Sequence, residues 1–172
     1  THSFVAKVGA ALNNGFSSSS NEAIADGLVE LDDYDGVLWL LGDEGLADQT
    51  FDQTEENLLE SYVGGGGSLI VSGAEVGYAT DSTWLSNVLH AGYVADNGGT
   101  NVAGGYTFGA EYEEDYPDVL SGETVIWKYN TGGSAAVGWA GQIIVVGFGL
   151  ENLEAKDRAE AYLELTSWVD DS

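Results

Sequence analysis

The sequence contains no cysteine and no methionine, and it has only four lysine and arginine residues. Without cysteine, disulfide bonds and thiol nucleophiles are excluded. No stretch approaches the roughly 18 consecutive apolar residues of a membrane-spanning helix, so we expect no membrane insertion. Apolar residues still make up 44% of the 172 residues, which is enough for one domain with a buried core.

The shortage of basic residues leaves 29 Asp and Glu residues largely unbalanced, and the formal net charge is −25. A chain of this charge repels nucleic-acid phosphates and anionic membranes. We therefore expect its partners to be cations, neutral polysaccharide or other protein chains, including further copies of itself. A solvated acidic surface on a salt-exposed protein is the simplest explanation of the charge, and calcium binding is the alternative.

Apolar runs and glycine-rich breaks predict alternating strands and helices. The central prediction is a β-α-β unit, with strands at 37–41 and 68–72 joined by a helix at 53–63, which implies a parallel pair with a right-handed crossover. The segment 97–122 is Gly-rich, acidic and aromatic, and we expect a long loop there. The other predicted elements are helices at 4–15, 81–92 and 151–169, a strand at 93–96, and antiparallel strands at 123–130, 134–141 and 142–149.

Several segments resemble a known family: GDE at 42–44, the stretch 50–78, DYPDVL at 115–120 and IIVVGFGLENL at 143–153. In these the chain resembles a bacterial extracellular domain found beside xanthan-lyase-type polysaccharide lyases and secreted peptidases. That domain is similar to class I glutamine amidotransferases. The resemblance implies an α/β fold, a flavodoxin-like three-layer α/β/α sandwich with a mostly parallel sheet and antiparallel C-terminal strands. It also implies a prokaryotic protein located outside the cell or on its surface.

One departure from this family concerns its first strand. The resemblance implies a single domain over residues 1–172, but the chain enters the first predicted helix almost at once, so the family's first, central strand has no counterpart. A missing central strand would leave backbone groups of its neighbours unpaired. Either a local strand fills the gap or another chain donates one, and the second option would make the protein a self-assembling surface or filament subunit.

The turn after the strand at 68–72 lies where amidotransferases place their nucleophilic cysteine. Here it carries Ser72, Gly73 and Ala74, without the G-x-S-x-G pattern of a serine nucleophile elbow. Of the two histidines, His90 is expected to end a helix and to interact with its dipole there. We interpret the turn as a degenerate elbow and assign no catalytic residue.

Carboxylates remain at this edge. Asp43 and Glu44 follow the strand at 37–41, and Glu75 follows the strand at 68–72. Open α/β sheets bind ligands at the carboxyl ends of parallel strands. The three residues are therefore candidates for binding a ligand or an ion such as calcium, although they could equally accept hydrogen bonds from the loop backbone.

A second acidic segment, 111–118, interleaves tyrosines with carboxylates. Tyrosine beside aspartate suits the stacking and hydrogen bonding of sugars, or the rim of a protein contact, and a solvated loop is the alternative. The candidate residues are Tyr112, Asp115, Tyr116 and Asp118.

Together these observations favour a non-catalytic extracellular module that binds or has a structural role. Two alternatives stay open: a self-assembling subunit completed by a neighbour's strand, and a carboxylate- or metal-dependent hydrolase using Asp43, Glu44 and Glu75. No cofactor is required by the sequence, and calcium is the one cofactor suggested.

Overall fold

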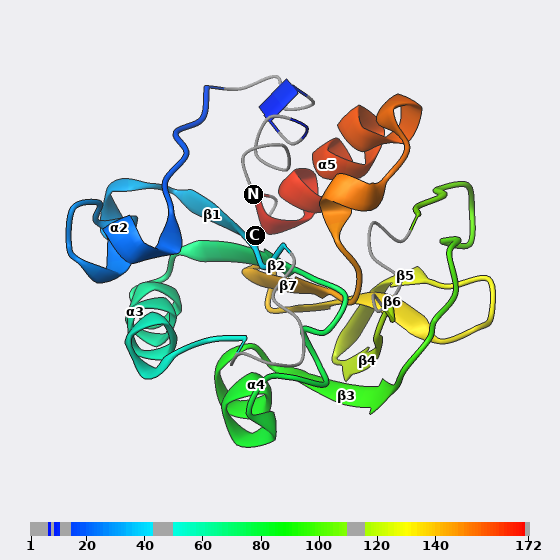
Figure 1. Ribbon diagram of the computed structural model, residues 1–172, viewed down its shortest axis with the longest axis horizontal. Coiled ribbons are helices and arrows are strands. Elements are labelled where there is room, and N and C mark those ends of the chain that lie inside the picture. The colour runs from blue at the N-terminus through cyan, green and yellow to red at the C-terminus, as the bar shows by residue number, and fades with distance from the viewer. Residues whose placement is uncertain (1–6, 8, 11–14, 43–49, 110–115, 171–172) are drawn as a thin grey trace.

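The computed structural model describes residues 7, 9–10, 15–42, 50–109 and 116–170. These form a mixed seven-stranded sheet in the order β1-β2-β7-β6-β4-β3, with β5 paired to β6 (Figure 1). The strands are β1 (Gly36–Leu40), β2 (Ser68–Ser72), β3 (Ala91–Ala95), β4 (Val119–Gly122), β5 (Thr124–Lys128), β6 (Ser134–Trp139) and β7 (Ile143–Val146). The α-helices are α2 (Asn21–Ala25), α3 (Gln53–Gly64), α4 (Ser82–Val88) and α5 (Ala155–Asp170).

The predicted β-α-β unit is confirmed. Strands β1 and β2 are parallel neighbours, with Val37 opposite Leu69. Helix α3 between them begins at Asp52, whose side chain accepts hydrogen bonds from the backbone of Thr54 and Glu55. Glu55 in return accepts from the Asp52 backbone at 2.9 Å, which completes a capping box. Local capping and apolar runs thus determine this part of the fold.

Short connections join β5 to β6 and β6 to β7, and they determine the direction of these C-terminal strands. Between β6 and β7 the chain reverses at Ala140 and Gly141, which both have positive φ, at 54° and 68°. Gln142 N donates to Trp139 O at 3.0 Å and closes the turn. A connection this short can only join antiparallel strands. The predicted antiparallel pairing of the C-terminal strands is confirmed for β5 with β6 and for β6 with β7.

The expectation of a three-layer α/β/α sandwich with a mostly parallel sheet is wrong. In the described sheet, β1-β2 and β2-β7 are parallel, whereas β3-β4, β4-β6, β5-β6 and β6-β7 are antiparallel. That expectation came from the resemblance to a flavodoxin-like family, whose parallel pattern holds here for β1, β2 and β7. The described residues form seven strands and four α-helices, and the protein is a mixed α/β fold in which α5 and the irregular segment 97–109 pack on one sheet face.

The core lies on both faces of the sheet. One cluster packs α3 and α4 against the sheet, with Leu59 and Leu85 fully buried. The other packs α5 through Tyr162, together with the irregular segment 97–109 through Phe108. Figure 1 shows α5 and the pair α3 and α4 on opposite sides of the strands. The segment expected to be a featureless loop is therefore partly a cover for the sheet.

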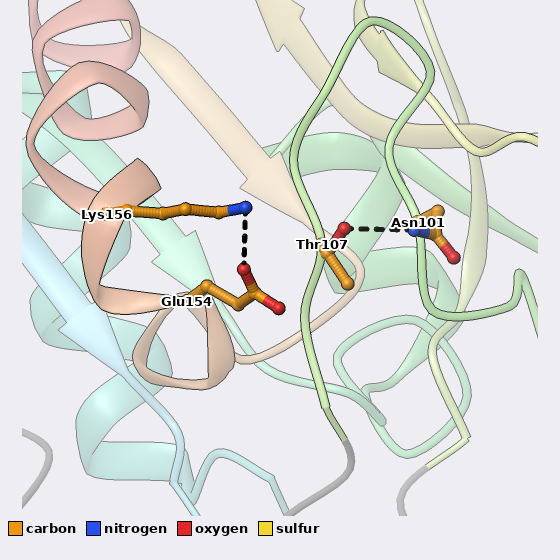
Figure 2. A network of polar contacts seen from close by, with 4 residues as sticks. All are labelled: Asn101, Thr107, Glu154 and Lys156. Carbon is orange, nitrogen blue, oxygen red and sulfur yellow. Dashed lines mark hydrogen bonds and ion pairs between the residues drawn. The ribbon is translucent and has the colours of Figure 1, made fainter.

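Segment 97–109 is attached beside the start of α5 (Figure 2). Asn101 Nδ2 donates to Thr107 Oγ1 at 3.0 Å, and Glu154 N donates to Thr107 O at 3.1 Å. Glu154 also pairs with Lys156 at 3.0 Å, where both side chains are exposed. Of these contacts, the bond between Glu154 and Thr107 joins the loop to the residue before α5, which is about fifty residues later in the sequence.

The gap expected from a missing central strand is not present in the described sheet. Strand β1 pairs directly with β2, and β2 pairs directly with β7. Between β1, β2 and β7 there is therefore no vacant position that a strand from another chain could fill. Of the predicted helix at 4–15, Lys7, Gly9 and Ala10 are helical and the other residues up to 14 lie outside the described part.

None of the helices that the structure describes has both the length and the apolar content needed to cross a bilayer.

Candidate ligand-binding surface at the carboxyl edge of the sheet

Ser72, the proposed remnant of a nucleophile, is a buried structural residue. Its side chain has no exposed surface. Its hydroxyl donates to Phe148 O at 2.8 Å and accepts from Leu150 N at 2.8 Å. A hydroxyl engaged on both sides by the backbone is neither accessible nor activated. Ser72 therefore joins the end of β2 to the segment that follows β7.

The next residues of the turn are closely packed. A Cβ atom on Gly73 would lie 2.7 Å from Cδ1 of Leu41, so glycine is needed for the chain to pass there. Ala74 is half-buried. Ser72, Gly73 and Ala74, which we interpret as a degenerate elbow, thus form a compact turn.

Two of the predicted candidate segments meet at this turn. Glu75 Oε1 accepts from the backbone N of Tyr116 at 3.4 Å, although the two residues are far apart in sequence. The carboxyl of Asp118 reaches the same turn, where its Oδ2 accepts from Gly77 N at 2.7 Å and from Tyr78 N at 2.9 Å. The turn 73–78 and the end of the acidic segment 111–118 therefore form one site.

Asp118 is completely buried and is fixed through its backbone as well. Its N donates to Gly147 O at 2.7 Å, and its carbonyl accepts from the Tyr129 hydroxyl at 2.8 Å. Its second carboxyl oxygen, Oδ1, is buried and has no hydrogen-bond partner among the described residues. Ionising a buried carboxyl that has one oxygen without a hydrogen-bond partner costs free energy.

The pKa of Asp118 reflects this environment. Burial, with a smaller contribution from the negative charges of Glu75 and Asp96, raises the pKa from its ordinary 3.8 to about 7. The two backbone N–H groups of Gly77 and Tyr78 act in the opposite direction but do not outweigh burial. The group therefore changes its protonation state near neutral pH.

The segments that meet here carry three exposed tyrosines. Tyr78 is 54% exposed, Tyr116 47% and Tyr93, on β3, 38%. The rings of Tyr78 and Tyr93 meet edge to face, with centroids 5.6 Å apart. We call Tyr78, Tyr93 and Tyr116 the tyrosine face. It presents aromatic surface beside carboxylate oxygens, which is the combination that sequence analysis sought in 111–118.

The carboxylate of Asp96 holds the side chain of Tyr93 in place. Its hydroxyl donates to Asp96 Oδ1 at 2.6 Å, and this hydrogen bond is the main cause that raises the pKa of Tyr93 to about 12. The phenol therefore stays protonated at physiological pH. Its ring orientation is set at one side by Asp96 and at the other by Tyr78.

The other predicted ligands lie outside the part of the chain that the structure describes. These are Asp43 and Glu44, which follow β1 in the sequence, and Tyr112 and Asp115 of the acidic segment. Within the described ranges, no group of three or more His, Asp or Glu side chains is arranged to bind a metal ion. A calcium site at Asp43, Glu44 and Glu75 stays a prediction.

His90 lies at the opposite edge of the sheet. It follows α4 with a positive φ of 54° and stacks on Trp139 with ring centroids 3.7 Å apart. Trp139 is opposite Ile143, the first residue of β7, whereas Ser72 is opposite Val146, the last. The stacked pair lines an open hollow of about 330 Å³ together with Glu123. His90 is thus an aromatic packing residue rather than the end of a helix.

Sequence reasoning missed Tyr78, Tyr93 and Asp96. Tyr78 belongs to the same VSGAEVGY turn as Glu75, and an aromatic residue in a ligand-facing loop could have marked it. Tyr93 and Asp96 carry no comparable signal, because their place beside Tyr78 depends on how β3 joins β4, which local patterns do not reveal.

Comparison with known proteins adds little. No protein-family model matches the sequence, and no curated protein matches it. A similar solved structure is the Exo-beta-1,4-mannosidase Op5Man5 from Opitutaceae bacterium strain TAV5, with a TM-score of 0.48 and 14% sequence identity. The match covers 83% of this chain but only 25% of that one, so the chain spans about a quarter of the mannosidase. At this level of similarity we draw no conclusion about fold or activity from it.

Proposed function

We propose that the chain is a non-catalytic binding module that takes neutral polysaccharide on the tyrosine face. The observation that carries the proposal is the pair of exposed rings of Tyr78 and Tyr93, 54% and 38% exposed, edge to face beside the carboxyl groups of Asp96 and Glu75. Exposed apolar rings that are grouped, unlike single ones, mark interaction sites on a protein surface.

The chemistry of this face suits sugars. Tyrosine offers an apolar ring for the C–H face of a pyranose and a hydroxyl for its polar edge. Carboxylate oxygens accept hydrogen bonds from sugar hydroxyls. The net charge of −25 repels anionic polymers and leaves neutral polysaccharides as the favoured class. The resemblance to domains that accompany polysaccharide lyases agrees with this class and with a location outside the cell.

The described acidic groups support binding over catalysis. A general acid must reach the substrate, and Asp118, whose pKa is raised to about 7, has no exposed surface. The Ser72 hydroxyl is likewise occupied by the backbone of Phe148 and Leu150. The buried groups Ser72 and Asp118 thus hold the loops under the tyrosine face in place.

Affinity electrophoresis and titration calorimetry with galactomannan and hydroxyethyl cellulose test the proposal, with anionic xanthan as the charge comparison. We expect at least one neutral polymer to bind, and Tyr78→Ala and Tyr93→Ala each to weaken that binding about tenfold or more, as an aromatic contact of roughly 1.5 kcal/mol would. Tyr34→Ala is the matched control, because Tyr34 is 39% exposed but lies before β1.

Equal losses in Tyr34→Ala and Tyr78→Ala would argue against this face. Failure of every neutral polymer to bind would remove the polysaccharide proposal, and capture of a protein partner would point to the module's other expected class of partner.

A further inference from the structure

The backbone of Asp118 is held in place independently of its carboxyl group. Its N–H is bonded to Gly147 O at 2.7 Å and its carbonyl to the Tyr129 hydroxyl at 2.8 Å. Tyr129 is itself 1% exposed, and a Cβ atom on Gly147 would lie 2.2 Å from the Asp118 carbonyl oxygen. With so little space around it, Asp118 cannot readily move toward water. A change at its carboxyl group must therefore be taken up by what the carboxyl touches.

The carboxyl touches the turn that carries Tyr78. Oδ2 accepts from the N–H groups of both Gly77 and Tyr78. Gly77 is tightly enclosed, because a Cβ there would lie 2.9 Å from Leu120, 3.0 Å from Asp118 Oδ2 and 3.3 Å from Tyr93. The turn is thus packed between Asp118 and Tyr93, and its next residue brings the Tyr78 ring against Tyr93.

We propose that Asp118 is a positioning residue of the tyrosine face: its protonated carboxyl holds the Tyr78–Tyr93 pair in the binding geometry, and its ionisation releases the turn 73–78. The effect of the pair on polysaccharide rests on the proposed function, whereas the conformational step does not. A preformed aromatic pair binds more tightly than one that must be ordered on binding.

The groups that face the carboxyl explain why ionisation, and not protonation, is expected to release the turn. Glu75 on the turn and Asp96 after β3 are negative and oppose ionisation, as does burial. The phenols of Tyr78 and Tyr93 lie on the same side, and that of Tyr129 is engaged with the Asp118 carbonyl. The N–H groups of Gly77 and Tyr78 are the favourable contacts of the ionised form, and they do not outweigh the others. A carboxylate here gains stability by admitting water, which requires the turn to move.

Ligand-free NMR across a pH series tests the conformational step. We expect the amide signals of Gly77 and Tyr78 to shift together with one midpoint near the Asp118 pKa of about 7. Nuclear Overhauser contacts between the Tyr78 and Tyr93 rings should be present below the midpoint and weaken above it. Asp118→Asn should abolish both changes, and Glu75→Gln should lower the midpoint by removing a nearby charge.

Binding to hydroxyethyl cellulose and galactomannan, measured at about pH 6 and about pH 8.5, tests the consequence. If only the protonated form is competent, affinity falls by up to about thirtyfold over this range, since each pH unit above the pKa reduces the competent fraction tenfold. In Asp118→Asn the affinity should not depend on pH.

The outcomes separate the two proposals. If the amide signals of Gly77 and Tyr78 shift with one midpoint but neither polymer binds, Asp118 is supported as the positioning residue and the polysaccharide function is overturned. Binding with flat amide and ring signals between about pH 6 and about pH 8.5 would overturn the role of Asp118 and leave the function standing. The wild-type pH series decides the matter even if Asp118→Asn does not fold.

Discussion

Ser72 and Asp118 are two buried polar residues at the same edge of the sheet, and they behave differently. Both have no exposed surface, and both bond to backbone groups of other segments. The Ser72 hydroxyl donates once and accepts once, so it is satisfied at every pH. The Asp118 carboxyl has one oxygen with two donors and another with no described partner, and its pKa is raised to about 7. The hydrogen bonds of Ser72 therefore stabilise the fold at every pH, whereas the charge of Asp118 depends on pH.

The largest effect is expected from crowding the backbone around Asp118. In Gly147→Ala the new Cβ would lie 2.2 Å from the Asp118 carbonyl oxygen, and backbone cannot yield as a flexible side chain does. We expect the free energy of unfolding to fall by about 3 kcal/mol or more in urea denaturation, as for a severe overpacking substitution.

The matched control for this change is Gly64→Ala, at the last position of α3, where a Cβ would meet nothing within 4 Å. Alanine there should be neutral or stabilising by up to about 1 kcal/mol. If both variants lost similar stability, the close contact between Gly147 and Asp118 would be wrong.

The next largest effect is expected at Ser72. Ser72→Ala leaves the carbonyl of Phe148 and the N–H of Leu150 buried without this partner, so we expect a loss of roughly 2 to 3 kcal/mol. The loss should be the same at pH 5 and pH 8, because a hydroxyl does not titrate there. Urea denaturation at both pH values measures it, with the exposed Ser19→Ala as a control near zero.

A Ser72→Ala loss that changed strongly with pH would remove the contrast between the two sites.

The local part of the fold could be predicted from sequence, and the long-range part could not. Apolar runs, the cap at Asp52 and glycine breaks place strands β1 and β2 and helix α3 correctly. The insertion of β7 next to β2 joins residues about 75 apart, and nothing in either strand's pattern selects that neighbour. That pair is parallel, but the pairs β3-β4, β4-β6, β5-β6 and β6-β7 are antiparallel, so the expectation of a mostly parallel sheet was wrong.

The site shows the same division. The acidic run 111–118 predicts a solvent-exposed segment, because carboxylates are seldom buried. Asp118 is buried among segments far apart in the chain: its carboxyl accepts from Gly77 N and Tyr78 N, and its backbone bonds to Tyr129 and Gly147. Its candidacy could be predicted from residue type, but its burial and its contact with the turn 73–78 could not.

A smaller effect is expected in the pH dependence of stability. The Asp118 pKa of about 7 lies above the ordinary 3.8, so the native state binds more protons than the unfolded state between these values. Stability therefore falls as pH rises from about 4 to about 7 and levels off above that. The full difference corresponds to about 4 kcal/mol, and we expect roughly half of it because opening of the turn hydrates the carboxylate.

The measurement compares urea denaturation of the wild type and Asp118→Asn across this range, since the other acidic residues contribute to both proteins. The wild type should lose about 2 kcal/mol more than the variant between about pH 4 and about pH 7.5. Parallel profiles for the two proteins would show that Asp118 titrates normally.

The smallest effect is expected from Tyr129→Phe, and it tests whether the Asp118 backbone and carboxyl act separately. The variant removes one buried hydrogen bond of 2.8 Å to the Asp118 carbonyl, which should cost about 1 kcal/mol. Because that hydroxyl bonds the main chain and not the carboxyl, the slope of stability against pH should stay as in the wild type. A lost slope in urea denaturation would mean that the anchoring of the backbone, rather than the contact with Gly77 and Tyr78, raises the pKa of Asp118.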